Sequence, residues 1–136
     1  MTVSGEQRQS TLAIALPRSV QAPSQARAAI ASLSADVELD RRVVQTLLLL
    51  VSEVVSNAVL HSAAAADSEI CLEAAVREDA VRITVTDDGE GFIPGPRDPA
   101  RLEGGFGLFL VAKAASRWEV QPGAPTRVWF ELDLEG

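Results

Sequence analysis

The sequence predicts an α+β fold: a two-layer α/β sandwich in which helices cover one face of a mixed β-sheet. Two observations lead to this prediction. Strand-like runs of alternating and β-branched residues stand near both ends and in the middle of the chain, with helix-forming stretches between them. The length of 136 residues permits one domain with a two-layer core. We therefore expect residues 10–136 to form one domain after a flexible polar tail over residues 1–9.

The first half of this domain is predicted to hold one strand and two helices. Residues 11–16 (TLAIAL) form a strand-like run that a proline ends. Residues 23–33 are rich in alanine, the strongest helix former. A second helix begins after Asp36 or Asp40, either of which can cap it, and runs to about Ser62. Because this helix is apolar almost all round, we expect it at the centre of the domain.

The second half is predicted to hold four strands, a loop and a helix. Two runs, 69–77 and 80–87, alternate like paired strands and are joined by a tight turn. Residues 88–104 hold four glycines and three prolines, which indicates a loop. The chain then continues with a helix over 105–116 and two strands over 118–120 and 127–134.

Composition and charge argue against several classes of protein. The net charge of −7 argues against a nucleic-acid partner, because a phosphate backbone favours clustered Lys and Arg. The apolar stretch 43–60 contains too many polar residues for a lone membrane helix, and the N-terminus lacks the apolar segment of a signal peptide. We expect a soluble cytoplasmic domain.

Large or reactive apolar residues are expected in the core. The single cysteine, Cys71, stands in an apolar strand and is predicted to be buried. The aromatic residues in periodic segments are expected to be buried as well; they are Phe109, Trp118, Trp129 and Phe130.

The first chemical motif is a polar face on the long helix. Glu53, Asn57 and His61 are spaced four apart, so they share one side of an otherwise apolar helix. The Asn57 carbonyl oxygen suits Mg²⁺, which takes few protein ligands, and Glu53 could deprotonate a hydroxyl nucleophile. A solvated polar stripe is the alternative.

The second motif, Asp87-x-Gly89-x-Gly91, directly follows a strand. A carboxylate at a strand end can accept a hydrogen bond from an exocyclic amine such as that of adenine, and the glycines let the backbone pass close to a flat base. An ordinary Asp-Gly turn is the alternative. A calcium loop is excluded because its twelfth position is Asp98, not the required glutamate.

The third motif is a run of glycines, Gly104-Gly105-Phe106-Gly107-Leu108, in front of a helix. Amides at a helix N-terminus can hold phosphates. The run lacks the Gly-Lys-Ser/Thr of a Walker A loop and the third glycine of a dinucleotide-binding fingerprint. A flexible helix entry is the alternative.

In this order, the three motifs and the closing strand T-R-V-W-F resemble the anti-sigma-factor serine/threonine kinases of the GHKL superfamily, whose ATP-binding domain has the Bergerat fold. The resemblance covers roughly residues 11–134. It implies ATP and Mg²⁺ as cofactors, and phosphorylation of a serine or threonine on an anti-sigma-factor antagonist (a STAS-domain protein). It also implies sequestration of a sigma factor by partner switching, and a homodimer.

The resemblance assigns roles to individual residues. It makes Glu53 the general base, Asn57 the Mg²⁺ ligand and Asp87 the carboxylate that reads adenine. The remaining positions are Gly89 and Gly91 beside the base, the phosphate-contacting Gly105 and Gly107 with their neighbours Phe106 and Leu108, a lid over 92–104, and Thr126 near the adenine.

A non-catalytic nucleotide-binding or interaction module of the same fold is the alternative function. Glu103 stands where these kinases often carry a basic residue facing the phosphates, and Pro125 stands where a glycine is usual. A histidine-kinase catalytic part and a gyrase-like ATPase are disfavoured, because the chain leaves no room for a phospho-accepting hairpin or a transducer domain.

Overall fold

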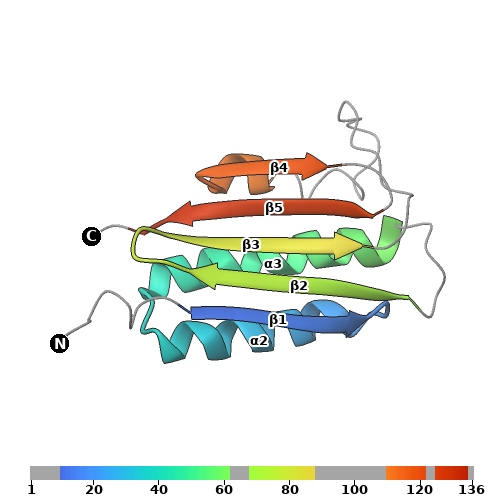
Figure 1. The fold of residues 1–136 in the computed structure, drawn as a ribbon, viewed down its shortest axis with the longest axis horizontal. Coiled ribbons are helices and arrows are strands. Elements are labelled where there is room, and N and C mark those ends of the chain that lie inside the picture. The colour runs from blue at the N-terminus through green and yellow to red at the C-terminus, as the bar shows by residue number, and fades with distance from the viewer. Residues whose placement is uncertain (1–9, 62–67, 88–109, 122–124, 135–136) are drawn as a thin grey trace.

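A computed structural model describes residues 10–61, 68–87, 110–121 and 125–134 of the chain. Five strands form one sheet, and two long helices lie on one face of it (Figure 1). The predicted α+β sandwich is therefore confirmed.

The first half of the chain forms one strand and two helices, as predicted. Strand β1 spans Ser10–Pro17, helix α2 spans Ala22–Asp36 and helix α3 spans Arg41–His61. Of the two candidate caps for α3, Asp40 is the one that acts: its Oδ2 accepts a hydrogen bond from the backbone N–H of Arg42 at 3.3 Å.

The second half supplies the remaining strands. A hairpin joins β2 to β3 through a tight turn, in which the Arg77 N–H donates to the Ala80 carbonyl at 2.9 Å. Residues 110–114 are helical. The four strands are β2 Glu69–Val76, β3 Ala80–Asp87, β4 Arg117–Gln121 and β5 Thr126–Asp133.

The direction of strand pairing differs from the expected mixed sheet. The strand order is β1-β2-β3-β5-β4, and each of the four pairs between described strands is antiparallel. Strands β3 and β4 do point the same way, as a connection through a helix favours. They are not neighbours, however, because β5 inserts between them (Figure 1).

Helix α3 contributes one face to the core. The buried residues of this face are Leu47, Leu50, Val51, Val54 and Val55. The opposite face is open, and Leu49 is 47% exposed. By length and composition the stretch Arg41–Val59 could also cross a membrane, but the core helix of a soluble domain meets the same criterion. The contacts of α3 with α2, β3 and β5 fit a core helix, although it is less enclosed than its composition predicts.

Three expectations for the core are wrong. Cys71 is exposed, because it lies on the outer face of β2 while its neighbours Ile70 and Leu72 point inward. Trp118 is 40% exposed on the edge strand β4. Phe130 is fully buried as predicted. Trp129 is half-buried on the outer face, and Phe109 lies outside the described residues.

Candidate nucleotide site

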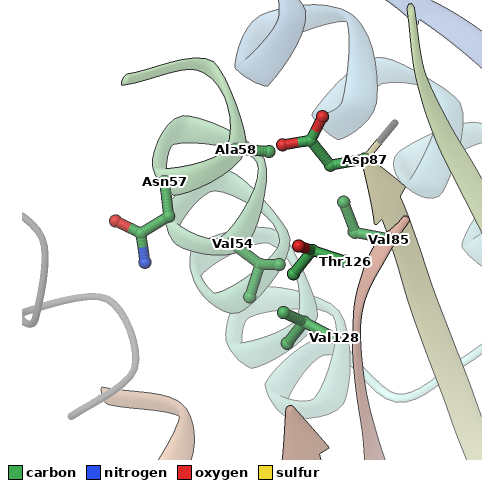
Figure 2. A pocket seen from close by; sticks show the side chains of 7 residues that line it. All are labelled: Val54, Asn57, Ala58, Val85, Asp87, Thr126 and Val128. Atoms are coloured by element: carbon green, nitrogen blue, oxygen red, sulfur yellow. The ribbon is translucent and has the colours of Figure 1, made fainter. Parts of the chain in front are cut away.

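A small pocket lies where the last turns of α3 meet the end of β3 and the start of β5. Figure 2 shows the Asp87 carboxylate directed toward Ala58 on the helix. The lining residues come from three elements: Val54, Asn57 and Ala58 from α3, Val85 and Asp87 from β3, and Thr126 and Val128 from β5. The pocket is therefore apolar, with three polar side chains from segments far apart in sequence.

Strand pairing brings two of the predicted residues together. Asp87 and Thr126 are directly opposite each other on β3 and β5. Both are buried, at 4% and 3% exposure, although they are polar. Their neighbours on the same face, Val85 and Val128, form the apolar wall beside them. An acceptor and a hydroxyl flanked by valines make a surface suited to a flat heterocycle with polar edges.

Asn57 lies on the helix side of the pocket. It lies one turn after Val54 on α3, so both side chains line the pocket. Its Nδ2 atom is buried and has no hydrogen-bond partner among the described residues. A buried amide left without a partner costs about 1–3 kcal/mol, which a bound ligand would recover.

Sequence reasoning missed Arg18, which lies just after β1. Its Nη2 donates to Oδ1 of Asp87, its Nη1 donates to the Ala58 carbonyl at 2.7 Å, and its Nε donates to Oγ of Ser68 at 2.9 Å. The Arg18 and Asp87 side chains are each 6% exposed. A buried carboxylate needs a countercharge, so the burial of Asp87 signals such a partner. The sequence does not identify it, because the two residues are 69 positions apart.

Sequence reasoning also missed the apolar residues that line the pocket, although the periodicity of the sequence predicts them. Val85 and Asp87 share a strand face, since side chains two apart point the same way. Val54 and Ala58 lie three residues before and one after Asn57 on α3. Helical and strand periodicity around the polar motif residues could therefore have predicted that these apolar residues line the pocket.

Glu53 is not among the side chains that line the pocket. It is half-buried on α3, one turn before Asn57. The structure thus brings together Asn57, Asp87 and Thr126, but not Glu53. The other predicted cofactor-binding positions lie outside the described residues: Gly89, Gly91, Gly105, Phe106, Gly107 and Leu108.

The described side chains fit part of a nucleotide site. The cavity that they enclose is about 20 Å³, room for one water molecule, so they make the floor of a site rather than all of it. The unpartnered Asn57 amide and the buried Asp87 acceptor suit a ligand with both donors and acceptors. Among the described residues no three His, Cys, Asp or Glu side chains form a metal-binding group. A divalent ion at Asn57 would therefore take most of its ligands from phosphate and water, as Mg²⁺ does.

The fold and pocket together define a class: an α+β sandwich with a small pocket between a core helix and the sheet. The sequence model of the histidine kinase-like ATPase domain matches residues 15–131, most of the chain. The chain belongs to this family. The resemblance to GHKL-type ATPases drawn from its motifs is confirmed.

A solved structure shares the fold. The chain is similar to the crystal structure of the RsbU and RsbW domains of Rv1364c from Mycobacterium tuberculosis, with a TM-score of 0.75 and 23% sequence identity. The alignment covers 92% of this chain and 32% of that one, so this chain spans about a third of the length of the protein it matches. Among curated proteins, no sequence matches it.

Proposed function

We propose that this domain is an ATP-binding anti-sigma factor with serine/threonine protein kinase activity. The observation that carries the proposal is the pocket that Asn57 on α3 lines together with Asp87 and Thr126 on the sheet. The family match supports ATP binding, and the likeness to a protein with an RsbW domain supports the anti-sigma-factor role.

Each polar residue has a part in this function. Asp87, buried and ion-paired, accepts a hydrogen bond from the exocyclic amine of adenine, and Thr126 on the adjoining strand lies within the same recognition surface. Asn57 holds Mg²⁺ through its carbonyl oxygen and offers its amide to a phosphate oxygen. Bound ATP supplies the γ-phosphoryl group. Glu53 orients the partner's serine or threonine hydroxyl and accepts its proton.

The partners follow from the same proposal. The phosphorylated protein is an anti-sigma-factor antagonist with a STAS domain, and the other partner is a sigma factor. Partner switching requires only that one partner binds the nucleotide-loaded domain better than the other. In this scheme the domain is a cytoplasmic homodimer.

Two measurements test the proposal in sequence. Calorimetry with ATP and Mg²⁺ is expected to show saturable binding that Asn57→Ala and Asp87→Asn abolish, while Arg42→Met, an exposed change at the other end of α3, leaves it intact. Phosphate transfer from labelled ATP to a STAS-domain antagonist is then expected with wild type and lost in Glu53→Gln. Folded wild-type protein that fails to bind ATP overturns the proposal.

A non-catalytic nucleotide-binding module of the same fold is the second candidate. One observation favours it: Glu53, the proposed base, does not line the pocket. ATP binding without transfer to any STAS-domain substrate supports this candidate, whereas transfer by a protein preparation freed of other kinases contradicts it.

A further inference from the structure

Arg18 joins four parts of the fold behind the pocket. It follows β1, contacts α3 through the Ala58 carbonyl, reaches Ser68 just before β2, and pairs with Asp87 at the end of β3. Each of its three guanidinium nitrogens thus donates to a different segment. The planar, rigid arrangement of these donors suits such a junction better than the single ammonium of lysine.

Arg18 itself is not placed to contact a bound ligand. Its side chain is 6% exposed, and it is not among the residues that line the pocket, whereas Ala58 and Asp87 are. Its contacts are therefore made within the protein, to Ser68 and to two residues that line the pocket. A side chain held at three points can fix the position of the carboxylate that it contacts.

We propose that Arg18 is a positioning residue for nucleobase recognition: it holds the Asp87 carboxylate oriented as an acceptor, and so gives the site its preference for adenine over guanine. This inference rests on the proposed function, since it requires that Asp87 reads the base. An ionised carboxylate accepts hydrogen bonds and donates none. Adenine presents an amine donor at C6, whereas guanine presents a carbonyl oxygen there, which a carboxylate repels.

The pair explains why the preference can be strong. A buried carboxylate without a countercharge would turn toward water. A carboxylate turned away would no longer accept from the adenine amine or repel the guanine oxygen, and discrimination between the two bases would fall. Because Arg18 and Asp87 are both buried, their interaction is little screened by salt.

The test measures base selectivity in addition to affinity. The dissociation constants of ATP and GTP, each with Mg²⁺, are measured by calorimetry for wild type, Arg18→Met and Arg18→Lys. Wild type is expected to favour ATP. Arg18→Met is expected to weaken ATP binding by about tenfold or more and to bring the ATP-to-GTP ratio close to one. Arg18→Lys keeps the positive charge but loses the three guanidinium donors. It is expected to recover part of the ATP affinity and part of the preference for ATP over GTP.

Controls separate positioning from general damage. Arg42→Met removes an exposed arginine and is expected to keep wild-type selectivity. If Arg18→Met does not fold, Arg18→Lys carries the test and is expected to discriminate less than wild type.

The outcomes distinguish the two proposals. Wild-type protein that does not bind ATP overturns the proposed function and this inference with it. Wild-type protein that prefers ATP, with the same preference in every folded Arg18 variant, overturns the inference alone.

Discussion

Two of the three polar side chains at the pocket, Asp87 and Asn57, differ in whether their polar atoms have a partner. Asp87 is paired with Arg18, so its charge is compensated before any ligand arrives. The Asn57 amide nitrogen is buried with no partner among the described residues. The first arrangement leaves neither buried charge without a partner. The second costs stability in the free protein, which indicates that its benefit appears only on binding.

Replacing Asn57 should therefore separate stability from binding. Asn57→Ala removes an unpartnered buried amide and places a better helix former in α3, so the free energy of unfolding should stay level or rise by about 0.5–1 kcal/mol. Mg²⁺-dependent ATP binding should be lost. Urea denaturation and calorimetry on the same samples measure both effects.

Ser56→Ala is the matched control for Asn57→Ala, because Ser56 is also on α3 but does not line the pocket. It should leave ATP binding intact. A loss of about 2 kcal/mol or more in Asn57→Ala would mean that the native amide is well partnered, contrary to our interpretation.

At the scale of elements, the two faces of α3 differ in burial. One face is buried against the sheet and α2, and the other is open to solvent. Adjacent leucines mark the boundary: Leu50 is 0% exposed and Leu49 is 47% exposed. The sequence alone does not distinguish them, because both belong to the same apolar run.

These two leucines should respond differently to truncation. Leu50→Ala leaves a cavity in the core and should lower the free energy of unfolding by about 2–5 kcal/mol. Leu49→Ala, with the same change in volume, should cost about 1 kcal/mol or less, because much of its surface is already in water. Chemical denaturation of both variants makes the comparison. Equal losses would mean that the open face of α3 is covered in solution.

The outer face of the sheet has its own ionic network. Glu131 on β5 accepts hydrogen bonds from Arg117 at 2.7 Å and from Arg82 at 2.9 Å, and Arg82 also stacks on the Trp129 ring at 3.9 Å. These bonds, with Arg117 the larger contributor, hold the pKa of the Glu131 carboxyl below its ordinary value. The network ties β3, β4 and β5 together on the face opposite the helices.

This network predicts a pH dependence with a definite sign. A carboxyl whose pKa is lowered by folding stabilises the native state above its unfolded pKa of about 4.3, and loses that contribution as the pH falls through the folded value. Wild type should thus lose more stability than Glu131→Gln between about pH 5 and pH 3. Urea midpoints across this range provide the measurement. Parallel curves for the two proteins would show that the network contributes nothing.

At the scale of the whole molecule, the sequence predicts local structure better than assembly. Alternation in β2 and β3, and helix-forming composition in α2, identify those elements directly. The insertion of β5 between β3 and β4 depends on contacts between segments far apart in the chain, which no local sequence pattern predicts. The same parity rule that identifies β2 also places Cys71 beside Glu69 and Glu73 on the outer face, so the expectation of a buried cysteine ignored an available signal.

The residues of the candidate site also differ in how far the sequence predicts them. Asn57 and Asp87 could be named from sequence because their residue types and spacing suit a ligand, and Thr126 was named through the family resemblance. The fold brings the three together. Arg18 could not be named, since its contacts arise from packing between segments 69 residues apart. Sequence patterns thus identify candidate site residues more readily than the residues that hold them in place.

A pocket shared by α3, β3 and β5 should couple ligand binding to the stability of the whole domain, because unfolding separates its walls. Any ligand that binds the native state alone stabilises it by RT ln(1 + [L]/Kd), or about 2.7 kcal/mol at a hundredfold excess over Kd. For a chain of 136 residues this should raise Tm by roughly 10 °C with ATP and Mg²⁺ together. Thermal unfolding followed by circular dichroism, with Mg²⁺ alone as the reference, measures the shift. The same rise in Asn57→Ala and in Asp87→Asn would place the nucleotide elsewhere, whereas a rise confined to proteins that retain both residues would tie the stability of the fold to the pocket.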